Sequence, residues 1–232
     1  MSNHVPEPVL QPTPILSLRP TQITLGMREV EIKRKTWSAH NPKKLDAFLA
    51  AHMVPVIMGP GEVPYLIDHH HLARALHDQG VASVFVTVVA DMSGVDPDLF
   101  WNVMNFRGWT HPYDSKGRRR DQTDLPKTVQ GMKDDPYRSL AGELRNIGGF
   151  AKDSTPYAEF LWADFLRGRI ARKAIERDFD AALAEARKFA ATKDANYLPG
   201  WCAPPAMDAK QAKGKKSKAA GQHEQKEPAS TQ

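Results

Sequence analysis

The sequence predicts an α+β fold, in which a small mixed sheet with helices is followed by an all-helical extension. Up to about residue 110, short apolar segments rich in β-branched residues alternate with segments of helical spacing. Beyond that point the apolar residues recur only at helical spacing. Mixed elements followed by helices alone are typical of α+β architecture. We therefore expect a first domain over 14–112 and a helical extension packed on it over 113–200.

Turn and cap residues divide the first half into elements. Gly59-Pro60-Gly61 separates two apolar runs and predicts a hairpin, and Gly80 is a suitable helix stop. Asn41-Pro42 and Asp96-Pro97 each place a capping side chain before a proline, as at a helix start. The expected elements are a strand at 15–18, a segment of ambiguous class at 26–37, a helix from 42, strands at 54–58 and 63–67, a helix from about 70 to 79, a doubly buried strand at 81–90 and a helix from 97.

The second half reads as helices separated by polar and glycine-containing breaks. A polar loop from His111 to Pro126 comes first, and Gly148-Gly149 then interrupts the helical pattern. Phe160, Phe165 and Leu166 give one segment a wide apolar face. We expect helices at about 127–133, 136–147, 156–175 and 178–192.

Composition favours a globular domain with polar ends. The chain has 232 residues, 41% of them hydrophobic and 25% charged, and no apolar run approaches the roughly 20 residues of a membrane span. The single Cys202 fits a reducing compartment. With no signal-peptide pattern at the N-terminus, we expect a cytoplasmic protein without membrane contact. Residues 1–13 and the basic tail at 201–232 are expected to be disordered; the tail either binds nucleic acid weakly or aids solubility.

One junction concentrates the chemistry of the chain. The apolar run ending at Ile67 is followed by Asp68, His69, His70 and His71, and a helical pattern begins there. Ligands of α/β folds commonly sit at such a strand-to-helix junction, against the helix N-terminus. Imidazoles titrate near neutrality and can transfer protons, and a carboxylate can orient an imidazole or act as a base. We expect these four residues to be catalytic.

A phosphate or a metal ion would suit this junction. Arg74 lies one turn after His70 on the same helix face, where a guanidinium can clamp an anion. Alternatively, Asp68, His70 and His71 could hold a divalent metal, with His40, His52 or His111 completing the shell, because adjacent helical ligands diverge. The residues alone leave the cofactor open.

Several longer stretches carry a family resemblance. They are Arg19-Pro20-Thr21-Gln22 with Gly26-Met27-Arg28-Glu29-Val30, then Leu125-Pro126-Lys127 with Asp134-Asp135-Pro136-Tyr137-Arg138-Ser139-Leu140, and Ala158-Glu159-Phe160 with Trp162-Ala163-Asp164-Phe165. Over about 14–175 the chain resembles the ParB/sulfiredoxin superfamily, and within it the ParB-like nucleases.

The junction departs from the boxes of its better-known relatives. The triphosphate-binding box of the partition proteins reads roughly Gly-Glu-Arg-Arg-x-Arg-Ala, whereas this chain has His69-His70-His71-Leu72-Ala73-Arg74-Ala75. The sulfiredoxin box needs a cysteine, and none stands here. The resemblance therefore implies a phosphate-handling pocket in which imidazoles replace arginines. It also places a second segment against the box, with Gln22, Arg28 and Lys33 as phosphate-binding residues and Glu29 as an acid or base.

Three functional hypotheses follow. The leading one is a hydrolase or phosphotransferase that acts on a phosphate-containing substrate, a nucleotide or nucleic acid, through the Asp-His-His-His site. The alternative is a non-catalytic ParB-like module that binds nucleic acid or a nucleotide. The third, implied by the superfamily, is a kinase-like use of the fold on a small metabolite.

Overall fold

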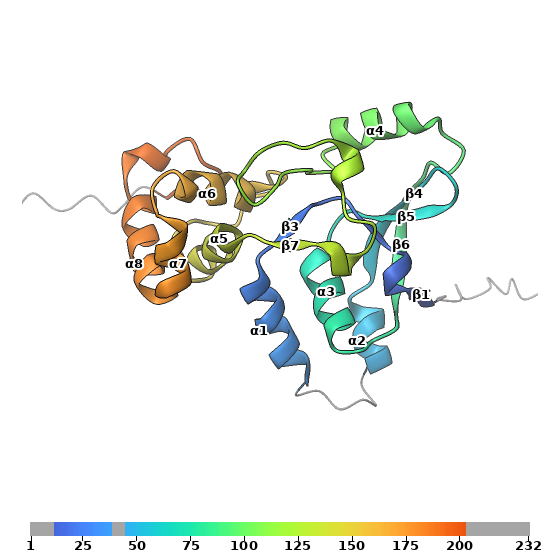
Figure 1. The fold of residues 1–232 in the computed structure, drawn as a ribbon, viewed down its shortest axis with the longest axis horizontal. Coiled ribbons are helices and arrows are strands. Elements are labelled where there is room, and N and C mark those ends of the chain that lie inside the picture. Colours follow the sequence, from blue (N-terminus) through green and yellow to red (C-terminus); the bar gives the residue numbers. More distant parts are fainter. Residues whose placement is uncertain (1–11, 39–44, 203–232) are drawn as a thin grey trace, which may run out of the picture. The chain divides into compact units, whose positions relative to one another are not determined.

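The structure is a computed structural model that describes residues 12–38 and 45–202, where a curled five-stranded mixed sheet is combined with eight α-helices (Figure 1). This confirms the α+β class. In chain order the elements are β1 (Pro12–Pro14), the 3₁₀ turn η1 (Ile15–Ser17), β2 (Arg19–Pro20), β3 (Thr24–Leu25), α1 (Met27–Ser38), α2 (Leu45–Ala51), β4 (Val54–Gly59), β5 (Val63–Leu66), α3 (His70–Asp78), β6 (Ser83–Asp91), α4 (Pro97–Phe106), η3 (Gln122–Asp124), η4 (Val129–Gly131), β7 (Lys133–Asp134), α5 (Pro136–Asn146), α6 (Ala158–Arg167), α7 (Arg172–Arg177), α8 (Phe179–Ala190) and η5 (Lys193–Ala195).

The main sheet has the order β1-β6-β4-β5-β2. The predicted hairpin forms, since β4 and β5 pair antiparallel, while β4 pairs parallel with β6 on its other side. The turn between β4 and β5 uses two left-handed residues, Gly61 with φ +73° and Glu62 with φ +59°. The strand predicted at 81–90 is β6, but it is not buried on both faces: Val88 and Val89 are 49% and 50% exposed. No described helix covers that part of the strand enough to bury them.

Acidic caps start the helices where the sequence predicted them. The Asp96 carboxylate accepts hydrogen bonds from the backbone N–H groups of Asp98 and Leu99, and Asp135 accepts one from Tyr137. A proline follows each capping residue in the first helical turn. The ambiguous segment at 26–37 is a helix, α1, in which Val30 is buried against α3.

Three expected elements take another form. Segment 15–18 forms a 3₁₀ turn instead of a strand. The last backbone hydrogen bond toward the β6 side is the one that Ile15 N–H donates to the Ala82 carbonyl, and the chain turns away from β6 beyond it. Segment 127–133 is a 3₁₀ turn followed by β7, because β3 offers it a parallel partner at Thr24. The helix expected over 156–175 is two helices, since α6 ends at Gly168 and α7 begins after Ala171.

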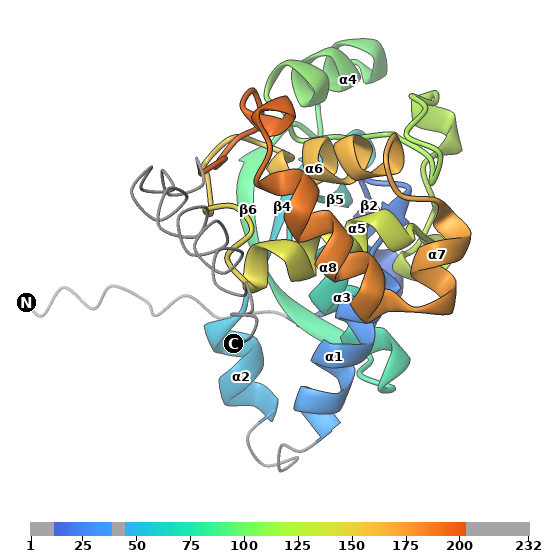
Figure 2. The ribbon, with the colours of Figure 1, turned by 90° about the vertical axis from the view of Figure 1, so that its left-hand side faces the viewer.

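The two largest of the four hydrophobic clusters among the described residues lie mainly in the first and the second half of the chain. One lies around the sheet and α3, with Val54, Val56, Leu66 and Leu76 at its centre. The other surrounds α5, which packs against α6, α7 and α8 (Figures 1 and 2).

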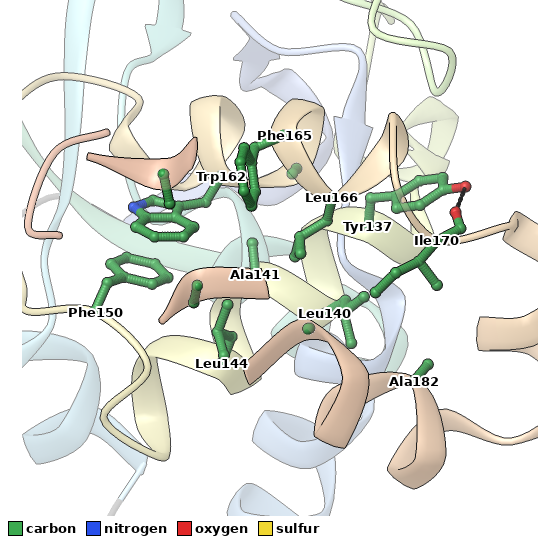
Figure 3. Packing of buried hydrophobic residues seen from close by; sticks show 14 of the residues in the cluster. Tyr137, Leu140, Ala141, Leu144, Phe150, Trp162, Phe165, Leu166, Ile170 and Ala182 are labelled. Atoms are coloured by element: carbon green, nitrogen blue, oxygen red, sulfur yellow. Dashed lines mark hydrogen bonds between the residues drawn. The ribbon is translucent and has the colours of Figure 1, made fainter. Parts of the chain in front are cut away.

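Aromatic stacking closes the helical core. The rings of Phe150 and Trp162 stack with centroids 4.3 Å apart, and the Tyr137 hydroxyl donates to the Ile170 carbonyl (Figure 3). Burial of such large rings supplies much of the stability of a small core. The core therefore holds α5 firmly, and α5 also packs against α1 of the first half.

The remaining organisational predictions concern the ends of the chain. The disorder expected at 1–13 and 201–232 falls almost entirely outside the described residues, as do His40 and Asn41-Pro42. The described residues belong to one compact unit, and the domain boundaries at 112 and 200 stay predictions. Among the helices of the described residues, none has the length and apolar character needed to cross a membrane.

Candidate functional site

The junction between β5 and α3 holds a strained histidine. His69 is the N-cap of α3 and has φ +63° and ψ 23°, in the left-handed region that costs an L-residue about 1–2 kcal/mol. The Asp68 carboxylate accepts a hydrogen bond from the His69 backbone N–H at 2.6 Å. The Nδ1 atom of the His69 side chain is buried, and it has no hydrogen-bond partner among the described residues. A strained backbone and an unpaired ring nitrogen at the same residue mark His69 as a functional candidate.

His70 and His71 are held by backbone donors. The Nε2 atom of His70 lies 3.3 Å from the Thr21 backbone N–H, and Nε2 of His71 accepts from the Gly26 backbone N–H at 3.1 Å. Both acceptors belong to α3 and both donors to the segment that precedes α1. The two imidazoles thus fasten this segment, which carries Gln22, to the start of α3.

Both histidines are neutral. Burial lowers the pKa of His70 to about 3, and the nearby positive charge of Arg138 adds to this effect. Burial likewise lowers the pKa of His71 well below its usual value. The Glu29 carboxylate lies 3.5 Å from His71 Nε2, but this is not an ion pair, because that nitrogen uses its lone pair to accept from Gly26. Neither imidazole carries a charge near neutral pH.

Of the four residues expected to bind phosphate, two line a cavity and two do not. Gln22 and Lys33 line a cavity beside the histidines, together with Glu29, which pairs with Lys33 at 3.5 Å. Arg74 is not among the lining residues, and its guanidinium instead binds the Asp78 carboxylate at 2.9 Å and three backbone carbonyls around η4. Arg28 points to the helical half, with its guanidinium 4.0 Å from the centroid of the Phe179 ring.

Two adjoining cavities meet in front of the junction. The larger, of about 700 Å³, is lined by residues of α1, α2, α3, α5 and α6, and the smaller, of about 350 Å³, by residues from the β5–α3 junction, α5 and α6. Their volumes fall in the range of small-molecule sites. The residues common to both linings form what we call the shared wall, and they are Gln22, Asp68, Arg138, Arg145, Lys152 and Glu159.

Arg138 is the buried cation of the shared wall. Its residue is 6% exposed, and its guanidinium lies 3.5 Å from the centroid of the Phe160 ring and 3.8 Å from the Glu159 carboxylate. The Nε atom is buried and has no hydrogen-bond partner within the described part of the chain. Burial lowers its pKa to about 10, which still leaves it charged at neutral pH. An incompletely satisfied buried guanidinium is costly, so a bound anion would improve this arrangement.

Two further cations accompany Arg138. Arg145 pairs with the Glu159 carboxylate, and Lys152 follows α5 in the chain and lines both cavities. Sequence reasoning missed all three, because their distance in sequence from the histidines hides their proximity. The available signal was the spacing of Arg138 and Arg145, which puts them on one face of the predicted helix two turns apart.

Metal ligands are not grouped here. The described residues contain no cluster of three or more His, Cys, Asp or Glu side chains placed to hold a metal ion. The Nε2 lone pairs of His70 and His71 accept backbone hydrogen bonds, as described above. His52 lines the larger cavity and stacks on Phe48, whereas His111 lies in an aromatic cluster and lines neither cavity.

Comparison with known proteins supports the resemblance. Residues 12–168 match the model of the family described as "Putative ParB-like nuclease". The crystal structure of protein Atu1540 from Agrobacterium tumefaciens is similar, with a TM-score of 0.78 and 48% sequence identity over 85% of this chain and 100% of that chain. A search of curated proteins gives no match. The family model covers more than half of the sequence, and the chain therefore belongs to the ParB-like nuclease family.

Proposed function

We propose that the protein is a phosphoester hydrolase that binds the phosphate of a nucleotide or nucleic acid at the shared wall. The observation that carries this proposal is Arg138, a buried residue that lines both cavities and whose Nε has no hydrogen-bond partner among residues 12–38 and 45–202. Arg145 and Lys152 add positive charge on the same wall, and Lys33 adds it in the larger cavity. A phosphate offers several acceptor oxygens and would satisfy donors that the protein leaves unused.

The acid–base role falls on His69. Hydrolysis of a phosphoester forms a bond between water and phosphorus while the bond to the departing oxygen breaks, so the water must lose a proton and the leaving group must gain one. We assign one of these transfers to the imidazole of His69, a residue that lines the larger cavity and whose Nδ1 has no hydrogen-bond partner among the described residues. Asp68 is exposed and lies on the same wall, where its carboxylate can orient an attacking water.

His70 and His71 contribute by position. Each accepts a backbone hydrogen bond while neutral, and together they anchor the segment that brings Gln22 to the cavities. The three imidazoles stand in the segment that corresponds to the partition box, and we assign them different roles. All three residues line the larger cavity, and we assign proton transfer to His69 and the positioning of the pocket to His70 and His71.

A test needs to separate binding from turnover. We would measure hydrolysis of bis(4-nitrophenyl) phosphate by the full-length chain, and binding of inorganic phosphate by calorimetry. His69→Gln should lower turnover by about 100-fold or more, the usual weight of an acid–base group. Arg138→Met should weaken phosphate binding by about tenfold or more, because a direct charge contact is lost. The matched control is His77→Gln on the same helix, which lines neither cavity and should leave turnover unchanged.

Each result decides between the hypotheses. Phosphate binding that depends on Arg138 without any turnover would favour the non-catalytic binding module. Turnover that survives in His69→Gln would show that another residue transfers the proton. Phosphate binding that is equal in the wild type and in Arg138→Met would refute the site.

A further inference from the structure

The smaller cavity is lined by residues of two different kinds. They are the charged residues of the shared wall and a set of apolar and aromatic residues, Ile67, Phe150, Pro156, Tyr157 and Phe160. A lining that combines both kinds suits a ligand with an anionic part and a flat apolar part. The larger cavity alone would suffice for phosphate chemistry at His69, so the proposed function leaves the smaller one unexplained.

We propose that the smaller cavity is a subsite for a planar ring, so that the protein's ligand is a phosphate ester bearing an aromatic ring that stacks on Tyr157. This rests on the proposed function, since the phosphate of that ligand would bind the shared wall. A cavity of about 350 Å³ accepts one ring with its sugar, and it excludes a paired duplex. The substrate is then a mononucleotide, a strand end or an unstacked residue.

Tyr157 is fixed in place for such a role. It is the N-cap of α6 and has φ +59°, the same left-handed conformation as His69 at the start of α3. Its ring stacks on His111 with centroids 4.5 Å apart, and it meets the Phe160 ring nearly edge-on at 5.7 Å. Burial and the nearby Asp68 carboxylate raise the pKa of its hydroxyl. A large side chain held in a strained backbone conformation beside a cavity is typical of a binding site.

A layer of packed rings backs the subsite. His111 stacks on Tyr113 at 4.1 Å and touches Phe160 at 4.0 Å, and its pKa is lowered to about 3, mainly by burial. It is therefore a neutral, flat group that supports Tyr157 from behind. Because these contacts fix the ring before any ligand arrives, little side-chain entropy is lost on binding.

Gln22 gives the subsite a means of recognising a ring edge. Its residue is 8% exposed, and it belongs to the shared wall beside the ring-binding residues. A carboxamide both donates and accepts, and can pair with the polar edge of a nucleobase. A simple aryl ring offers no such edge.

The test compares ligands with and without a ring on the full-length chain by calorimetry. Adenosine 5′-monophosphate, cytidine 5′-monophosphate and phenyl phosphate are measured against ribose 5-phosphate. Ring–aromatic contact should make the ring-bearing ligands about fivefold tighter or more. Tyr157→Leu should bring that ratio close to one, and Tyr157→Phe should keep it, since the ring remains. The control Tyr197→Leu removes a ring that is 70% exposed and lines neither cavity, and it should preserve the ratio.

The outcomes separate this inference from the proposed function. Equal affinity for ribose 5-phosphate and all ring-bearing ligands would overturn the subsite, even if phosphoester turnover is present. A ring preference that survives in Tyr157→Leu would place the ring elsewhere and also overturn it. A ring preference that depends on Tyr157 supports the subsite even if no turnover is observed. The lack of turnover would then contradict the proposed hydrolysis but not the subsite. Nucleotides that bind more tightly than phenyl phosphate identify a nucleobase, and the reverse identifies a simple aryl group.

Discussion

The left-handed backbone of His69 predicts an unusual order of stability among its variants. At an ordinary helical position alanine is more stable than glycine by about 0.5–1 kcal/mol, because glycine loses more backbone freedom on folding. At φ +63° this order should reverse. Any side chain with a Cβ pays a left-handed penalty of about 1–2 kcal/mol there, and glycine does not. Subtracting the entropic disadvantage of glycine from this penalty, at the middle of each range, leaves His69→Gly more stable than His69→Ala by about 0.75 kcal/mol.

The measurement is the free energy of unfolding in urea, with equal m-values required for the comparison. For a unit of this size the difference corresponds to a shift of about 1–4 °C in the thermal midpoint. Both variants should lose phosphoester turnover equally, because both lack the imidazole. His69→Ala equal to or more stable than His69→Gly would refute the reasoning, since it would mean that residue 69 is not left-handed in solution.

Two further predictions concern the histidines His70 and His111, and Arg74 of α3. Burial holds the pKa of His70 and of His111 at about 3, against 6.5 in an unfolded chain, so the unfolded state takes up protons that the folded state does not. The stability from these groups is therefore complete above pH 6.5 and falls as the pH drops toward 3, by up to about 1.4 kcal/mol per pH unit for each histidine. Urea unfolding between pH 7 and 5 measures this slope, which His111→Phe should reduce; a flat profile in the wild type would contradict the burial. Arg74→Met should lower the free energy of unfolding by about 2 kcal/mol, because the guanidinium binds Asp78 and the η4 carbonyls, and it should leave phosphate binding unchanged. If Arg74→Met instead loses phosphate affinity while its free energy of unfolding stays that of the wild type, Arg74 is a phosphate ligand.

Local sequence signals predicted the local structure. Asp96-Pro97 begins a helix as predicted, because a carboxylate cap and a proline at the first turn act within four residues. The structure shows the same cap at Asp135-Pro136, where the sequence predicted the helix but its cap was not identified. The hairpin at 59–63 was predicted for the same reason, since turn residues determine their own backbone geometry. The cluster of histidines at the start of α3 was found from the end of one apolar run and the start of another.

Long-range contacts explain what the sequence could not show. The pairing of β3 with β7 turns an expected helix into a strand, and no property of 127–133 alone reveals that partner. Which imidazole accepts a backbone hydrogen bond depends on how the segment before α1 lies against α3. His69, His70 and His71 are the same residue type and adjacent in sequence, and only the fold separates their hydrogen-bond partners.

Most of the cations that line the two cavities come from the second half of the chain and not from the β5–α3 junction. The resemblance implies that the partition box supplies its own arginines, whereas here the one arginine retained in the box, Arg74, binds Asp78 and backbone carbonyls. Among the cations that line the cavities, Arg138 and Arg145 come from α5, Lys152 follows that helix, and Lys33 comes from α1. Helix α5 packs in the core of the second half of the chain and also contacts α1. Both cavities therefore draw lining residues from either side of position 112, and three of these four cations come from beyond it.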